Sequence, residues 1–246
     1  MTDEHHTIAE SSHAGEHEPF LAHHFDTHAQ QLNAGKLGMW IFLLTEILLF
    51  SGLFLIYTVY RSHHPEIFVW AHQFLDKTLG GVNTVVLIAS SFTMAWAVRC
   101  AQKNQRRGSI VLLVLTWFCA CGFLGIKYVE YKHKWQDGLL WASRFKPNEH
   151  EIEAIQKHYP DPGHVASDVE NAPRNAGIFF SIYFAMTGLH GLHVLAGMIA
   201  IGWVLRRSIR GDFNSQYFGP VDFVGLYWHL VDLIWIYLFP LLYLIH

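Results

Sequence analysis

Charged residues are scarce in this sequence. Only 15% of its 246 residues are Asp, Glu, Lys or Arg, whereas an ordinary soluble domain carries about 25%. Hydrophobic residues make up 52% of the chain and aromatic residues 15%. This composition favours a membrane protein over a soluble one.

Several other features are also missing. The formal net charge is −3, and no basic stripe with interleaved aromatic residues predicts binding to nucleic acid. There are three cysteines, and Cys119 and Cys121 are too close in sequence to form a Cys-x-x-Cys motif or a disulfide. Residues 1–33 contain six acidic residues, no Lys or Arg and no apolar run, which is unlike a secretory signal peptide.

What the sequence does contain is five long stretches with almost no charge. A helix needs roughly 20 residues to cross a hydrocarbon core of about 30 Å. Five segments come close to this length or exceed it, so a soluble globular enzyme is excluded. The sequence predicts an all-α, polytopic membrane helix bundle with five transmembrane helices, at about 37–60, 81–98, 109–128, 175–205 and 224–245.

The short loops predict the orientation of the bundle. With the N-terminus inside, the inner segments hold eight Lys and Arg residues and the outer short segments hold two. Because short cytoplasmic loops carry an excess of Lys and Arg, we expect the N-terminus inside and the C-terminus outside. Aromatic residues toward the span ends are typical of an interfacial belt: Trp40, Tyr57, Trp96, Tyr128, Trp203, Trp228 and Tyr243.

Two polar regions flank or interrupt the expected membrane domain of residues 36–246. Residues 1–35 form a tail with seven histidines. A metal chelator is one interpretation, but without regular ligand spacing we favour a solvated, disordered tail. A long outer loop is expected at about 130–174, with a short amphipathic helix at 148–158. Neither region contains a catalytic motif.

Glu46 is the most informative single residue. It lies about 13 Å along the first span from Leu37, at 1.5 Å of rise per residue. An ionisable group at this depth is costly and is a candidate for proton handling or partner recognition. The structural alternative is a neutral carboxyl that donates one hydrogen bond to a neighbouring helix.

Intramembrane histidines and an aspartate form a second group. His190 and His193 are three positions apart on the fourth span, and His229 and Asp232 are three apart on the fifth. Imidazoles on facing helices can ligate haem iron, so His229 with His190 or His193 is a formal ligand pair. The alternative is hydrogen bonding between helices, with Asp232 orienting a histidine, and we favour it because the groups are too few for a larger metal centre.

Small residues and arginines complete the fourth span. Ala196 and Ala200 give a small-xxx-small pair, which allows close approach of a helix or a lipid tail. The adjacent Arg206 and Arg207, just beyond the span, are suited to hold an anionic or zwitterionic lipid head group.

Four ordered motifs then suggest a family. They are FLLTEILLFSG at 42–52, VNTVVLIAS at 82–90, TGLHGLHV at 187–194 and YWHLVD at 227–232, with Glu130 and Tyr131 after the third span. Together they resemble the cytochrome c oxidase subunit 3 family, which is subunit III of the heme–copper oxidases. The full family form has seven helices, and this chain is similar to the five-helix bacterial variety.

The resemblance implies a subunit without a catalytic centre of its own, in a proton-translocating cytochrome c oxidase of the aerobic respiratory chain. The haems and copper would lie in subunits I and II, and this chain would carry no cofactor or metal, only bound phospholipid. Glu46 corresponds to the family's membrane carboxyl, which supports proton uptake. His193 and Arg207 match positions near lipid head groups. Family motif positions with a structural role are His190, His229, Asp232 and Glu130.

Other functions stay open at this stage. The resemblance also includes subunit III of quinol oxidases and of nitric oxide reductase-type complexes, so the donor, cytochrome c or quinol, is not decided by this chain. A membrane b-type cytochrome is a further alternative. A secondary transporter would require internal repeats, and the five spans show no pairing. The expected location is the bacterial plasma membrane, as a multi-pass protein.

Overall fold

The computed structural model describes residues 25–136 and 177–245, except residue 216. All regular elements in this part of the chain are helical. They are α1 (His28–His63), α2 (Pro65–Ala71), the 3-10 helix η1 (His72–Phe74), α3 (Lys77–Gln102), α4 (Arg106–Gln136), α6 (Gly177–Arg210) and α7 (Gly219–Tyr243). Helices α1, α3, α4, α6 and α7 are the 5 that are long and apolar enough to cross a membrane. The predicted all-α bundle with five transmembrane helices is confirmed.

Two helices extend into segments that the sequence predicted to be tail or loop. Helix α1 begins at His28, inside the segment expected to be a polar tail. Helix α4 continues to Gln136, inside the expected loop at 130–174. Hydropathy detects only the apolar part of a helix, so polar turns at the ends are missed. Residues 1–24 of the tail and the expected helix at 148–158 lie outside the described residues.

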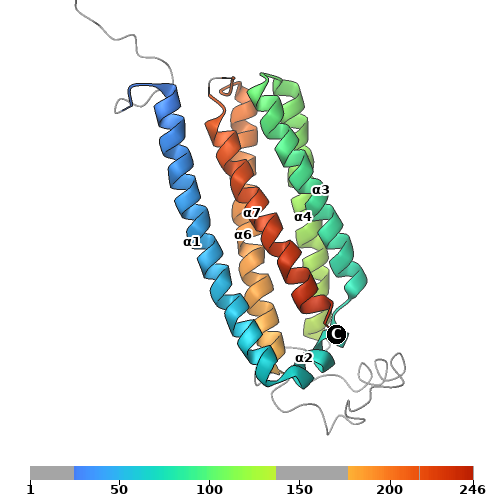
Figure 1. Ribbon diagram of the computed structural model, residues 1–246. Coiled ribbons are helices and arrows are strands. Elements are labelled where there is room, and N and C mark those ends of the chain that lie inside the picture. The colour runs from blue at the N-terminus through green and yellow to red at the C-terminus, as the bar shows by residue number, and fades with distance from the viewer. Residues whose placement is uncertain (1–24, 137–176, 216, 246) are drawn as a thin grey trace, which may run out of the picture.

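Helices α3, α4, α6 and α7 form a four-helix bundle, and α1 packs against α7 and α6 from outside it (Figure 1). The helix pairs in contact within the bundle, α3 with α4 and α7, and α6 with α4 and α7, all run antiparallel. Helix α1 is largely exposed and buries only Leu43, Phe50 and Tyr57. These three residues are seven positions apart, so they form one stripe along the helix.

The two ends of the bundle differ in composition. Helices α3 and α6 finish, and α4 and α7 begin, at one end, which we call the arginine end. It carries Arg99, Arg106, Arg107, Arg206, Arg207 and Arg210. The Arg106 guanidinium donates to the carbonyl oxygens of Ser208 and Ile209, which joins the start of α4 to the end of α6.

The predicted aromatic belt is only partly correct. Trp40, Trp96, Tyr128 and Trp203 are exposed, as residues at a membrane interface should be. Tyr57, Trp228 and Tyr243 are instead buried in the core. Trp228 and Tyr243 belong to α7, which lies between α3 and α6, so position along a span does not reveal which side chains face the other helices.

Short polar side chains of α3 bond to their own backbone and to neighbouring helices. Ser90 contacts Trp228 on α7, and Thr93 lies 2.8 Å from the hydroxyl of Thr116 on α4. Helices α6 and α7 also approach closely at Gly197, where an added Cβ would lie 2.7 Å from the Trp228 ring. These contacts align the four helices that carry most of the family-motif residues.

Candidate functional site

Glu46 and His193 meet between α1 and α6. The Glu46 Oε2 and His193 Nε2 atoms are 2.8 Å apart. The side chains are 16% and 15% exposed, so the pair is largely shielded by protein. Two residues that the sequence singled out separately, 147 positions apart, therefore form one site.

The local sequence explains why Glu46 faces α6. Glu46 follows Leu43 by three positions and precedes Phe50 by four, so it shares their buried helical face. The Phe50 ring packs edge-on against His193, with 5.1 Å between centroids. On α7, the Tyr227 hydroxyl donates to the carbonyl oxygen of His193 at 3.1 Å. Three helices thus surround the pair.

Hydrogen-bond geometry limits the protonation of this pair. His193 Nδ1 lies 2.8 Å from the carbonyl oxygen of Leu189, which can only accept, so Nδ1 carries hydrogen. Between Nε2 and Glu46 Oε2 one further hydrogen is needed. It resides on the carboxyl in a neutral pair, or on the imidazole in an ion pair. The pair therefore shares one proton and is neutral as a whole in both forms.

The other candidate residues are not at this site. His190 points into the core of the bundle instead, packed between the rings of Phe123 at 5.5 Å and Trp235 at 5.2 Å. Arg207 lies at the arginine end, where its Nε donates to Asp212 at 2.9 Å.

His229 and Asp232 bond to α3 rather than to each other. His229 Nδ1 is 2.7 Å from the Ser91 hydroxyl, and Asp232 Oδ2 is 3.3 Å from the Ser90 hydroxyl. The prediction that Asp232 orients a histidine is therefore wrong. Consecutive serines on α3 take the two side chains separately, because residues i and i+3 on α7 face neighbouring positions of the antiparallel helix.

The histidines suggested as a haem-ligand pair have different surroundings. Both ring nitrogens of His193 are in hydrogen bonds, so ligation would require it to give up Glu46 or Leu189. Within residues 25–136 and 177–245, no group of three or more His, Cys, Asp or Glu side chains could hold a metal ion.

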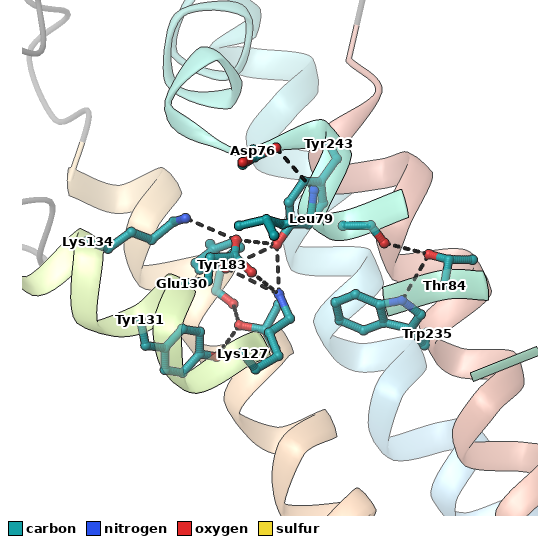
Figure 2. Close-up of polar contacts among 12 residues, drawn as sticks. Asp76, Leu79, Thr84, Lys127, Glu130, Tyr131, Lys134, Tyr183, Trp235 and Tyr243 are labelled. Carbon is teal, nitrogen blue, oxygen red and sulfur yellow. Dashed lines mark hydrogen bonds and ion pairs between the residues drawn. The ribbon is translucent and has the colours of Figure 1, made fainter. Parts of the chain in front are cut away.

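Glu130 belongs to a buried ionic cluster near the end of α4 that is opposite the arginine end (Figure 2). Its carboxylate accepts from Lys127 at 2.8 Å and from Lys134 at 3.0 Å. The hydroxyl groups of Tyr183 on α6 and Tyr243 on α7 also donate to it, at 2.8 Å and 2.5 Å. We call these five residues the Glu130 cluster.

Of this cluster, the sequence singled out only Glu130 as a site residue, and it placed Tyr243 in the aromatic belt. The signal that would have found the rest is the spacing of Lys127, Glu130 and Lys134, which puts both lysines on the same face of α4 as the glutamate. The tyrosines had no such signal, because α6 and α7 bring them in from distant positions. Lys127 also lies 4.5 Å from the centroid of the Trp235 ring. The cluster joins three helices through one shared carboxylate, which indicates a structural role.

At the arginine end, three arginines and Trp203 line a hollow of about 360 Å³. Of these, Arg207 is already held by Asp212 and lies 5.1 Å from the Trp203 ring centroid. Within the part of the chain that the structure describes, neither Arg206 nor Arg210 forms an ion pair, so they are the freer cations of the hollow. The arrangement is suited to an anionic group of the size of a phosphate ester.

Comparison with known proteins finds relatives along most of this chain. The family model described as cytochrome c oxidase subunit III matches residues 7–136 and 170–246. Cytochrome c oxidase subunit 3 of Thermostichus vulcanus is 31% identical over 85% of this chain and 86% of its own length. Quinol oxidase subunit 3 of Bacillus subtilis is 26% identical over 85% of each chain. A heme-copper oxidase subunit I+III of Aeropyrum pernix is 26% identical, and the match covers 22% of that longer chain. This five-helix chain therefore belongs to the cytochrome c oxidase subunit III family of the heme–copper oxidases.

Proposed function

We propose that this chain is the accessory subunit III of a terminal oxidase in which cytochrome c supplies the electrons. Haem and copper reside in subunits I and II, and this chain packs on the catalytic subunit in a bacterial plasma membrane with its arginine end inside. Support for the donor comes from relatives named cytochrome c oxidase subunit 3, which are 31% identical, whereas those named quinol oxidase are 26% identical or less.

The observation that carries a role in proton uptake is the contact between Glu46 and His193. A single proton shared over 2.8 Å can move between carboxyl and imidazole without changing the net charge of the pair. Because a net charge inside the hydrocarbon region is costly, such a pair can hold and pass a proton where a lone carboxylate could not remain. Its position between α1 and α6 is shielded but not sealed, at about one-sixth exposure.

A lipid-binding role rests on the hollow at the arginine end. Arg206, Arg207 and Arg210 line it together, and cationic pockets at a membrane surface bind lipid phosphates. Arg207 is fixed by Asp212 and by the ring of Trp203, so we expect it to shape the site. Arg206 and Arg210 would supply the charge that a phospholipid head group meets. His193, which the resemblance also assigns to lipid binding, lies away from this hollow, at its contact with Glu46.

The test is Glu46→Gln in the assembled oxidase. We expect haem content to be unchanged and proton uptake, or enzyme lifetime during turnover, to fall. The matched control is Glu66→Gln, which removes the carboxyl of an exposed Glu–His contact, 3.5 Å from His64, where α1 ends and α2 begins. Loss of the haem spectrum in Glu46→Gln, with the subunits still assembled, would contradict an accessory role.

The electron donor needs a separate experiment. The oxidase purified through a tag on this chain should oxidise reduced cytochrome c and not a quinol. It should also contain a large polytopic subunit with haem and a smaller one with copper. Quinol oxidation without cytochrome c oxidation would move the chain to the quinol branch of the family, and haem bound to this chain alone would favour a b-type cytochrome.

A further inference from the structure

Asp232 is an acidic residue in the core of the four-helix bundle, and its side chain has very few partners. It is 2% exposed and lies in the middle of α7. Its Oδ1 atom has no hydrogen-bond partner, and Oδ2 lies 3.3 Å from the Ser90 hydroxyl, with the Ser91 hydroxyl also nearby. Among the described residues, no lysine, arginine or histidine forms an ion pair with it.

The neighbours of Asp232 on α3 and α4 supply no counter-charge. On α3, the Ser91 hydroxyl lies near the carboxyl but is 2.7 Å from His229 Nδ1. On α4, Cys119 is within electrostatic range. Lys127, the buried cation of α4, is bonded to Glu130.

The three contacts of the Ser90 hydroxyl indicate whether Asp232 donates or accepts the hydrogen bond between them. Its hydroxyl oxygen contacts the Leu87 carbonyl at 2.8 Å, the Trp228 Nε1 at 3.1 Å and Asp232 Oδ2 at 3.3 Å. A serine hydroxyl has one hydrogen to donate and two lone pairs that accept. The Leu87 carbonyl only accepts and the Trp228 indole only donates. The Ser90 hydrogen therefore goes to Leu87, which is the shortest contact, and Trp228 occupies one lone pair.

One lone pair of Ser90 remains for Asp232, and only a donor can use it. We propose that Asp232 is a neutral carboxylic acid whose hydrogen on Oδ2 is donated to Ser90, which makes it a proton-binding site separate from the Glu46–His193 pair. In this form all three contacts of Ser90 are satisfied at once. The unpartnered Oδ1 is then the carbonyl oxygen of an acid and not part of a buried carboxylate.

The alternative, an ionised Asp232, is less consistent with the same contacts. The Ser90 hydrogen would have to leave the 2.8 Å contact with Leu87 for the 3.3 Å contact with Asp232. A full charge would then be buried with serine hydroxyls as its only donors and no cation, although buried charges in proteins are normally paired. The same bundle shows the contrast: Glu130 is equally buried, but two ammonium groups and two hydroxyls compensate its charge.

The experiment is infrared difference spectroscopy of the assembled oxidase at neutral pH, comparing the wild type with Asp232→Asn. We expect the wild type to show the C=O stretch of a protonated carboxylic acid that Asp232→Asn loses, with no change in the carboxylate stretches. The matched control is Asp222→Asn on the same helix. Because Asp222 is paired with Lys36 at 3.6 Å, its loss should remove carboxylate intensity only. Loss of carboxylate intensity in Asp232→Asn would overturn the proposal.

A second variant keeps the test valid if Asp232→Asn does not assemble. Ser90→Ala removes the acceptor and leaves the acid in place. In oxidase labelled with ¹³C-aspartate, the protonated aspartic C=O band should be present and should move on Ser90→Ala. If no protonated aspartic band responds to that substitution, Asp232 does not donate to Ser90 and the proposal fails. The effect of Glu46→Gln on proton uptake is measured separately and does not depend on Asp232 or Ser90. Failure of the Asp232 proposal would therefore leave the proposed proton-uptake role untouched.

Discussion

Lys127 and Glu130 form a buried ion pair, with 2.8 Å between Nζ and Oε2, one turn apart near the end of α4. The contact matters beyond its own helix, because the same carboxylate accepts hydrogen bonds from Tyr183 on α6 and Tyr243 on α7. A single side chain thus fixes the positions of three helices.

We expect Glu130→Gln to destabilise the subunit strongly. Two buried lysine side chains would lose their shared counter-charge, and breaking a buried pair on one side typically costs about 3–5 kcal/mol. Thermal unfolding in detergent, together with retention of this chain in the complex, measures the effect. Glu66→Gln, at an exposed pair, should cost no more than about 1 kcal/mol. An equal, small effect of both substitutions would show that the Glu130 cluster does not hold the helices together.

Gly197 should not tolerate a side chain. A Cβ there would lie 2.7 Å and 2.8 Å from two carbons of the Trp228 ring, so Gly197→Ala must push α6 from α7 at a cost of about 1–3 kcal/mol. Gly202 lies further along α6 with nothing within 4 Å of its added Cβ. Gly202→Ala should therefore be neutral or stabilise by up to about 1 kcal/mol, through helix propensity alone. Gly197→Ala should lower the melting temperature and Gly202→Ala should leave it unchanged or raise it, and a drop for both would point to a general effect of lost helix glycines.

The pair of Glu46 and His193 should appear as energetic coupling. Glu46→Gln and His193→Phe each leave the other partner without its original contact, so the double variant should be less damaged than the sum of the singles. A coupling of about 0.5–3 kcal/mol is typical of residues in direct contact. Stability of the isolated complex, measured for the four variants of the cycle, gives this number. The cycle of Glu66 with His193 should be additive within about 0.5 kcal/mol, since Glu66 contacts His64 instead.

The start of α3 depends on Asp76. Its carboxylate accepts from the backbone N–H groups of Thr78 at 2.8 Å and Leu79 at 3.1 Å. Asp76→Ala should lower stability by about 0.5–2 kcal/mol, whereas Asp76→Asn keeps an acceptor and should cost less. Hydrogen exchange of the first turn of α3 would locate the effect. If both variants exchanged at the wild-type rate, tertiary contacts, and not the cap, would hold this turn.

The sequence alone was sufficient for the architecture of the bundle. Charge-free stretches of membrane length predicted five transmembrane helices, because the hydrocarbon core excludes charge and unsatisfied backbone wherever a chain crosses it. Ordered motifs around Glu46, His193 and Asp232 also indicated the family, because those residues carry the resemblance directly. Ends of helices were less accurate, as at His28 and Gln136, because polar turns extend a helix without a hydropathy signal.

Partnerships between side chains were decided only by the tertiary structure. No spacing in the sequence joins Glu46 to His193, Asp232 to Ser90, or Tyr243 to Glu130, since each pair is brought together by helices that are distant along the chain. These partnerships control the chemistry. A buried carboxyl bonded to two ammonium groups remains a carboxylate, and one bonded to an imidazole shares a proton with it. A carboxyl that contacts a serine whose hydrogen is already donated elsewhere keeps its own proton. Hydropathy depends on residue type and so can be read from sequence, whereas the protonation of a buried acid depends on which donors and cations face it, and only the packing of the helices determines that.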